Sequence, residues 1–278
     1  MSANFWQSSH FTRWTFSKDE IARYRESNFK RRRFPIEKEI ALLNHYILLI
    51  QSVGKRIDCN QIVVATATSF FRRFYLLTSI LEYHPSIVAP TVLYLAAKVE
   101  EMGQILPIYV IRGFQKIRED PQKMSDFELI ISLEAMTAKE IFACEAEVLK
   151  TLKFDLVIFH AYHDLERYVT DFAKDAKDIS EKIFHAAWGI LNDTQRSDVY
   201  LVYPPCLVAL AAIYLACVDK GIDSRSWFQE LNVNLDQTRE CAEDILKAAD
   251  MDDQRVPEIR EIIEDFVRIF PPQPQQHR

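Results

Sequence analysis

The feature that most constrains this chain is an internal repeat. Pro85 recurs as Pro205, and the segment 94–101 recurs 120 residues later as 214–221. The first four positions of the two segments agree in apolar character, and two copies of one helical unit must bury the same pattern twice. The repeat therefore predicts two similar helical domains in a chain of 278 residues.

The two copies differ at the ends of these segments. Lys98 in the first copy faces Val218 in the second, and Glu101 faces Gly221. A charge that only one copy carries indicates a role at the surface of that copy, so we expect the functional site near Lys98. The alternative is an ordinary charged helix end, where a lysine suits the helix dipole.

The composition narrows the fold class and the kind of partner. Only 5 of the residues are glycine, which argues against phosphate-binding loops and tight hairpins and predicts an all-α protein. A net charge of −6 argues against direct binding to nucleic acid. The one strong basic run, 30–33, is either the solvated end of a helix or a nuclear-import signal.

Cysteine usage and hydropathy predict an intracellular, soluble protein. The 5 cysteines are odd in number and have no CxxC spacing, which predicts a reducing compartment and no structural zinc. The longest apolar run, 206–218, is shorter than the roughly 18 residues that a membrane-spanning helix needs. The proline- and glutamine-rich segment 271–278 is expected to be disordered.

Apolar spacing and capping signals predict helices along most of the chain. Residues 17–20 and 137–140 have the sequence of capping boxes, and Gly54 is expected to end the second helix. The β-branched run 62–65 has strand propensity, but its length and aromatic spacing favour a helix. The predicted helices cover about 17–33, 36–53, 60–74, 85–103, 107–117, 137–152, 161–173, 178–194, 205–219, 224–230, 235–249 and 256–269.

The sequence contains no recognised catalytic constellation. It lacks nucleophile-elbow, Walker, dinucleotide-binding and zinc-protease motifs, so no catalytic residue and no cofactor is predicted. His160, His163 and Glu166 form the only metal-like cluster, and surface or capping roles explain them better. Glu145, beside an apolar stripe of its helix, is instead a candidate companion for Lys98. Together the two could clamp the free carbonyl and amide groups of a partner helix.

These residues resemble the cyclins. Segment 95–101 is similar to the third-helix motif of the first cyclin box, and 145–156 is similar to the fifth-helix motif and the linker after it. The resemblance implies an all-α fold of two tandem five-helix cyclin boxes with an additional N-terminal helix. The implied domains are an aromatic segment and helix at 1–35, a kinase-binding first box at 36–153, a linker at 154–160, a second box at 161–270 and the tail at 271–278.

A narrower resemblance concerns the N-terminus. Segment 4–10, together with Trp14, is similar to the branch of cyclins that belongs to the Mediator kinase module. This implies a nuclear regulatory subunit, not an enzyme, that activates a Mediator-associated cyclin-dependent kinase in RNA polymerase II transcription. Direct binding to nucleic acid or to a membrane is not implied.

The resemblance implies three sets of site residues. The kinase-binding set is Lys98, Glu145, Leu95, Val99, Leu149, Phe154 and Leu156. The N-terminal partner-contacting set is Phe5, Trp6 and Trp14, unless these aromatic residues cover the protein's own core. A groove between the boxes, which would receive other Mediator kinase-module subunits, is assigned to Trp6, Glu100, Asn192 and Asp193. Asn192 and Asp193 could instead satisfy only local backbone groups.

Alternatives stay open at the level of sequence. Residues 42–46 lack the arginine of the substrate-docking patch of cell-cycle cyclins, which favours a transcriptional cyclin. Within that group, the chain could belong to the branch of the kinase-activating kinase or to the elongation-factor branch. A cyclin-box adaptor for DNA or basal transcription factors, and an enzyme of unrecognised type, are further hypotheses.

Overall fold

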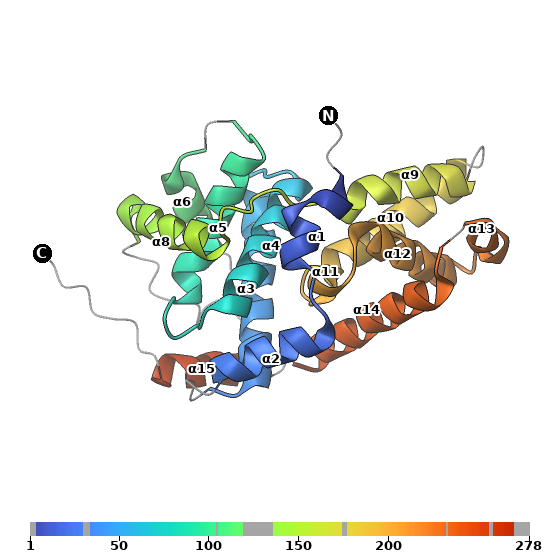
Figure 1. Ribbon diagram of the computed structural model, residues 1–278. Coiled ribbons are helices and arrows are strands. Elements are labelled where there is room, and N and C mark those ends of the chain that lie inside the picture. The colour runs from blue at the N-terminus through green and yellow to red at the C-terminus, as the bar shows by residue number, and fades with distance from the viewer. Residues whose placement is uncertain are drawn as a thin grey trace, which may run out of the picture. The chain divides into compact units, whose positions relative to one another are not determined.

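The computed structural model describes residues 4–29, 34–103, 105–118, 136–173, 177–231, 233–255 and 258–269 (Figure 1). These residues form helices and loops, with no strand among them, which confirms the predicted all-α class. The chain divides into two compact units. The first-repeat unit contains Lys18–Leu156 and Gln254–Arg278, and the second-repeat unit contains Met1–Ser17 and Val157–Asp253.

The first-repeat unit is built around α5, Pro85–Val99, which is buried along most of its length. A helix that is apolar on nearly every face needs neighbours on every side. α2, Lys18–Phe29, lies against α4. The helices that pack on α5 are α3 (Ile36–Arg56), α4 (Gln61–Leu77), α6 (Pro107–Arg118) and α8 (Ala138–Thr151) (Figure 1).

Local capping signals set the helix starts in this unit. Asn60 Oδ1 accepts a hydrogen bond from the third backbone amide of α4 at 2.9 Å, and the β-branched run that follows is helical as predicted. Thr137 and Glu140 form the predicted capping box at the start of α8. α2 begins directly after Ser17, where the sequence predicts a start.

Gly54 does not end α3 as predicted, because the helix continues to Arg56. A Cβ atom at Gly54 would lie 2.5 Å from Val64 Cγ2. The glycine therefore allows α3 to approach α4 closely, and tertiary packing overrides its poor helix propensity.

Other predicted ends differ or lie outside the described residues. α5 ends at Val99 rather than near Gly103. The predicted continuation of α2 to residue 33 and the tail at 271–278 lie outside the described part of the chain.

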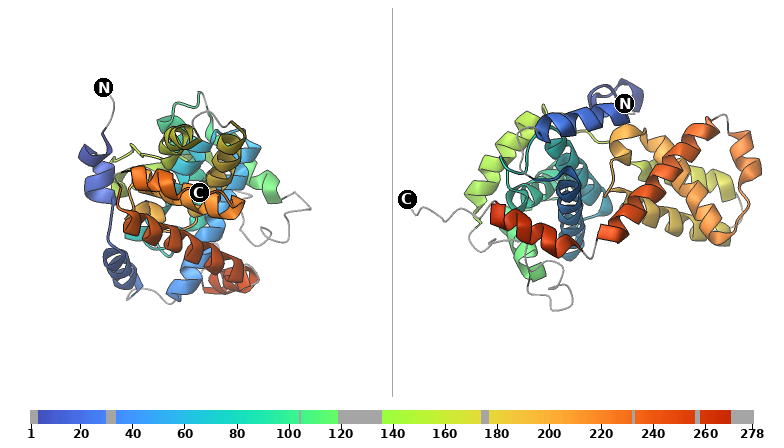
Figure 2. Two further views of the ribbon diagram at one scale, coloured as in Figure 1. Left: turned by 90° about the vertical axis from the view of Figure 1, so that its right-hand side faces the viewer. Right: turned by 90° about the horizontal axis from the view of Figure 1, so that it is seen from below.

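The second-repeat unit is built around α12, Pro205–Lys220, the counterpart of α5. α12 packs on α9 (Ala161–Ala173), α10 (Lys177–Thr194) and the four-residue α11 (Val199–Val202). Figure 2 shows this yellow-to-orange part of the chain from two further sides. α13 (Arg225–Glu230) and α14 (Leu235–Arg255) follow. The sequence predicts each of these helices except α11, which is too short to show a helical period.

The N-terminal segment belongs to the second-repeat unit. It contains η1 (Phe5–Gln7) and α1 (Ser9–Trp14), two short helices that the sequence reading does not predict. Ser8 caps α1 by accepting a hydrogen bond from a backbone amide at 3.2 Å. Ser8 is therefore the sequence feature from which the start of α1 could have been predicted.

The last helix, α15 (Ile259–Ile269), groups with the first-repeat unit, whereas the sequence assigns it to the second box at 161–270. Its apolar stripe is buried against that unit: the ring of Phe266 lies 5.8 Å from Phe34 and 5.1 Å from His84. Lys38 Nζ also donates to Asp265 Oδ2 at 2.5 Å. Long-range packing, which local sequence patterns do not encode, decides where α15 lies.

Candidate functional site

The candidate site begins with an ion pair between α5 and α8. Lys98, in the last turn of α5, contacts Glu145 Oε1 in the middle of α8 through its Nζ atom. The lysine side chain is 42% exposed and the glutamate side chain is 11% exposed. Because Glu145 Oε1 is buried, the Lys98 ammonium compensates a charge that water does not reach.

Two aromatic rings extend the site from this ion pair. Lys98 Nζ lies 4.8 Å from the centre of the Tyr94 ring, one helical turn earlier on α5. The Phe142 ring, from α8, lies 6.0 Å from the Tyr94 ring at an interplanar angle of 66°. We call Lys98, Glu145, Tyr94 and Phe142 the clamp cluster.

The backbone at the end of α5 holds Lys98 in place. Glu101 N donates to Lys98 O at 3.2 Å, and Met102 N donates to Ala97 O at 2.9 Å, which is the hydrogen-bond pattern of a Schellman motif. Glu101 has φ of 53°, a left-handed conformation that costs a residue with a Cβ atom about 1–2 kcal/mol. The tight end of α5 is thus kept at an energetic cost beside the clamp cluster.

α8 ends in the same way and exposes Phe154. Lys153 N donates to Lys150 O at 3.0 Å, and Phe154 N donates to Leu149 O at 3.0 Å. Lys153 and Phe154 have φ values of 54° and 59°. The next residue, Asp155, is buried, so an exposed ring is followed directly by a buried carboxylate.

Asp155 interacts electrostatically with Arg73, which is buried in α4. Burial lowers the pKa of Arg73 to about 9, and the charge of Asp155 opposes that shift. A buried arginine near a buried carboxylate fixes the segment that carries Phe154 to the body of the first-repeat unit.

The predicted kinase-binding residues do not share one environment. Leu95 is buried in the core, Val99, Leu149 and Leu156 are partly buried, and Phe154 is exposed. The exposed apolar residues of the same unit that the sequence did not single out include Phe142, Leu106, Ile108 and Tyr109. Phe142 precedes Glu145 by three residues, so helical spacing could have placed both on one face of α8. For the other three, apolar spacing alone does not separate surface from core.

The N-terminal aromatic residues pack within the second-repeat unit. The Phe5 ring lies 5.6 Å from Phe159, and Phe159 N donates to His10 Nδ1 at 3.1 Å. Trp14 is buried in this unit, which agrees with the alternative that the segment covers the protein's own core. Of the three predicted residues, Trp6 is the exposed one, and the neighbouring Phe11 is exposed as well.

Three of the four groove residues have polar partners in their own units. Glu100 Oε1 accepts from Thr66 Oγ1 at 2.7 Å in the first-repeat unit. In the second-repeat unit, Asn192 Oδ1 accepts from Tyr162 OH at 2.8 Å, and Asp193 pairs with an arginine one turn later at 3.2 Å. Because Glu100 and the other three residues belong to different units, the groove stays a prediction.

The burial of two cysteines argues against their reactivity. Burial raises the pKa of Cys59 and of Cys144 to about 11, which keeps both thiols protonated at neutral pH. Within the described ranges, no group of three histidine, cysteine, aspartate or glutamate side chains could hold a metal ion. No described helix is both long and apolar enough to cross a bilayer.

Family models match nearly the whole chain. Residues 15–157 match the model "Cyclin, N-terminal domain", and residues 160–268 match "Cyclin C-terminal domain". The two matches correspond to the two copies of the repeat, as the fold of two tandem cyclin boxes requires.

The curated relatives give the same result. The chain is 33% identical over 258 residues to Cyclin-C of Rattus norvegicus, covering 89% of this chain and 83% of the relative. It is 34% identical to Cyclin-C1-2 of Arabidopsis thaliana, and this match covers 88% of this chain and 90% of the relative. It is 32% identical to Cyclin-C of Drosophila pseudoobscura pseudoobscura, with 90% of each covered.

Solved structures share the fold. A chain of the yeast TFIIK complex has a TM-score of 0.64 at 25% identity, covering 87% of this chain and 100% of that one. A chain of the CAK complex of Chaetomium thermophilum, bound to ATP-gamma-S, has a TM-score of 0.72 at 22% identity, with 94% and 88% covered.

Proposed function

The chain belongs to the cyclin family, and on this premise we propose that it is the regulatory subunit of a transcription-associated cyclin-dependent kinase. We place it with its Cyclin-C relatives. Its partner is then the kinase of the Mediator complex, and its role is the regulation of RNA polymerase II transcription in the nucleus. The chain supplies no catalytic group to phosphoryl transfer.

A cyclin of this kind acts by shifting a conformational equilibrium. A protein kinase is inactive while its helix αC is displaced, because the αC glutamate then cannot reach the lysine that binds the ATP phosphates. A subunit that binds the active position of αC more tightly shifts the population toward it. A shift from 1:99 to 99:1 requires about 5.5 kcal/mol of differential binding. The chain therefore needs a surface that recognises one position of αC.

The clamp cluster is the observation that carries this proposal. It joins α5 to α8 in the first-repeat unit, and the second copy has Val218 at the position of Lys98. The partly exposed Lys98 ammonium is suited to donate to free carbonyl oxygens at the end of a kinase helix. Glu145 is mostly buried, so we assign it the role of positioning Lys98 rather than of accepting from the kinase. Phe142 and Phe154 supply exposed apolar area.

The test is a double charge reversal, Lys98→Glu with Glu145→Lys. Opposite charges remain at the two positions, so the first-repeat unit is expected to fold, but a carboxylate replaces the ammonium that faces the kinase. We expect the affinity for the Mediator kinase, measured by isothermal titration calorimetry, to fall by roughly 2–5 kcal/mol. Kinase activity on a polymerase repeat peptide should fall in parallel.

A matched control lies on the same helix. Glu147→Lys with Lys150→Glu reverses an ion pair of α8 whose Nζ and Oε1 atoms are 2.7 Å apart. This control should bind and activate the kinase as the unmodified chain does. Undiminished binding by the clamp variant, or an equal loss in the control, would contradict the assignment.

The runner-up is the branch of the kinase-activating kinase. Its support is the similarity in fold to chains of the TFIIK and CAK complexes. The identity of 33% to the rat Cyclin-C, against 25% to the TFIIK chain, favours the Mediator branch. In that branch we further propose that Trp6, Asn192 and Asp193 contact other subunits of the Mediator kinase module.

A further inference from the structure

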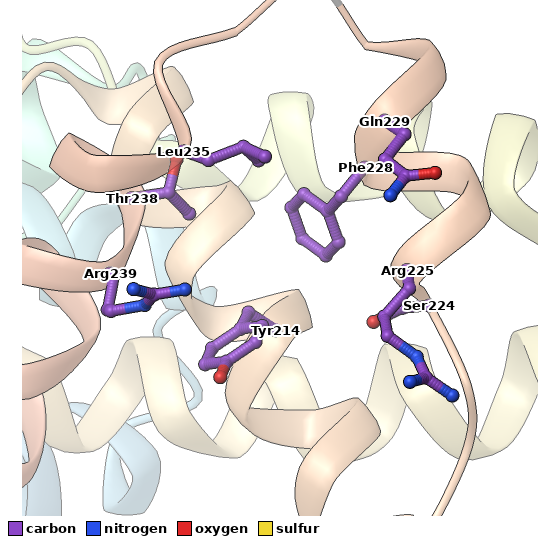
Figure 3. Close-up of a pocket in the computed structure, with 8 residues that line it drawn as sticks. All are labelled: Tyr214, Ser224, Arg225, Phe228, Gln229, Leu235, Thr238 and Arg239. Atoms are coloured by element: carbon purple, nitrogen blue, oxygen red, sulfur yellow. The ribbon is translucent and has the colours of Figure 1, made fainter.

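The second-repeat unit contains a cavity of about 160 Å³ between α12, α13 and α14. We call it the α12–α14 pocket. Small-molecule sites usually measure about 300–1,000 Å³, whereas a cavity near 150 Å³ holds a benzene ring. The pocket therefore has room for one aromatic side chain and not for a nucleotide. It is lined by Tyr214, Ser224, Arg225, Phe228, Gln229, Leu235, Thr238 and Arg239 (Figure 3).

The internal repeat shows how the surroundings of the pocket differ from the matching position of the first copy. Tyr214 is the counterpart of Tyr94 at the 120-residue offset of the repeat. In the first-repeat unit, Tyr94 is 8% exposed, with Lys98 over its face and the Phe142 ring 6.0 Å away. In the second-repeat unit, Tyr214 is 36% exposed and borders the cavity. Each tyrosine thus has a phenyl ring 6.0 Å away, Phe142 for Tyr94 and Phe228 for Tyr214, and Tyr214 in addition borders a cavity with space for a further ring.

The walls of the pocket suit an aromatic ring. Figure 3 shows the Phe228 ring and the Leu235 side chain extending toward the cavity from α13 and α14. The Phe228 ring lies 6.0 Å from the Tyr214 ring at 79°, so an inserted ring can make edge-to-face contacts. Leu235 is exposed although it is apolar, as expected for the rim of an unfilled site.

The charges at the pocket favour an anionic neighbour for that ring. Figure 3 shows the Arg239 guanidinium beside Tyr214. No described residue is ion-paired with Arg239. The second arginine, Arg225, pairs with Asp223 at 2.8 Å, and this pairing lowers the pKa of Asp223 to about 2. Arg239 is thus the cation available to a carboxylate that enters with the ring.

We propose that the α12–α14 pocket binds an aromatic side chain from an acidic segment of a protein partner. The ring enters between Tyr214 and Phe228, and an adjacent carboxylate pairs with Arg239. This surface is separate from the clamp cluster in sequence and in unit, so it can recruit a protein while the chain activates a kinase.

The test uses a fluorescein-labelled peptide, Gly-Asp-Asp-Phe-Asp-Glu-Gly, and the full chain. We expect fluorescence anisotropy to give a Kd below about 1 mM. Replacing the phenylalanine of the peptide by alanine should weaken binding at least about tenfold, and replacing its acidic residues by amides should have a similar effect. No binding below about 1 mM, or equal binding of the alanine peptide, overturns the proposal.

Variants of the chain locate the site. Arg239→Glu and Leu235→Glu should each weaken peptide binding at least about tenfold. Leu235 is the first residue of α14, where an acidic side chain suits the helix dipole, so that variant is expected to fold. Arg167→Glu on α9 makes the same charge change at another exposed arginine and should bind the peptide within about twofold of the unmodified chain.

Equal weakening by Arg239→Glu and Arg167→Glu would overturn the proposal, because it would indicate general charge attraction. Kinase affinity, measured on the same variants, separates this proposal from the proposed function. All three variants should bind the kinase as the unmodified chain does, whereas the clamp variant should bind the peptide normally.

Discussion

The ends of α5 and α12 share one backbone structure and carry different side chains. Gly221 N donates to Val218 O at 3.2 Å, and Ile222 N donates to Cys217 O at 2.9 Å. Glu101 N and Met102 N make the corresponding two hydrogen bonds at the same distances at the end of α5. The left-handed residue is a glycine in one copy and a glutamate in the other, with φ values of 64° and 53°.

This difference separates what the fold requires from what one surface requires. Both copies need a tight helix end, because both bury a central helix among neighbours. In the first copy, Lys98 is paired with a buried carboxylate. The second copy has Val218, which is 63% exposed, at the position of Lys98. Shared backbone with unshared charge therefore supports the proposal that the clamp cluster serves function rather than folding.

The largest effect that tests this comparison is expected at the N-terminal ends of α5 and α12. His84 caps α5 by accepting from Ser86 N, whereas Pro204 precedes α12 and makes no side-chain cap. Burial lowers the pKa of His84 to about 4. In the folded protein the imidazole is neutral between about pH 4 and 6.5, while in the unfolded chain it binds a proton there. Stability therefore falls as pH drops through this window, by at most about 3 kcal/mol.

His84→Asn should remove this pH dependence, because asparagine caps a helix well and does not titrate. The measurement is the free energy of unfolding at several values from pH 7 to pH 4, for both proteins. The lost ring contact with Phe266 should lower the stability of the variant equally at every pH. Parallel curves for the two proteins would show that His84 is not the source of the acid sensitivity.

A smaller effect on stability is expected at Glu101 and Gly221, the two residues with left-handed backbone conformation at the ends of α5 and α12. Gly221→Ala should destabilise the protein by about 1–2 kcal/mol, because no atom lies within 4 Å of the new Cβ and the cost is that of the backbone alone. Glu101→Gly should stabilise it by less than about 1 kcal/mol, since glycine also loses more conformational entropy on folding. Urea unfolding measures both changes. A stabilising Gly221→Ala substitution would show that the two ends are not equivalent.

Sequence patterns predicted the helices where a local interaction fixes them, as at Asn60 and at the capping box of Thr137 and Glu140. The prediction that Gly54 ends α3 was wrong, because the role of this glycine depends on the close approach of α4, a different helix. The same limit applies to the site. Lys98 and Glu145 were predicted together and lie together, but the exposure of Phe142 depends on how neighbouring helices pack, which apolar spacing does not encode.

The smallest expected effect tests whether Lys98 is required by the fold. Val218→Lys gives α12 the side chain that α5 has, above Tyr214 in place of Tyr94. A lysine at the C-terminal end of a helix, near an aromatic face, should change stability by no more than about 0.5–1 kcal/mol and in the stabilising direction. Urea unfolding measures this change.

The same variant should not create a second kinase site. The described residues that line the cavity beside Tyr214 include Thr238 and Arg239 but no carboxylate in the place of Glu145, so the new ammonium would have no buried charge to position it. Calorimetric titration should therefore still give one kinase per chain with unchanged affinity. A second binding event would mean that a lysine at the end of this helix is sufficient, and that the buried glutamate of the first copy contributes nothing to recognition.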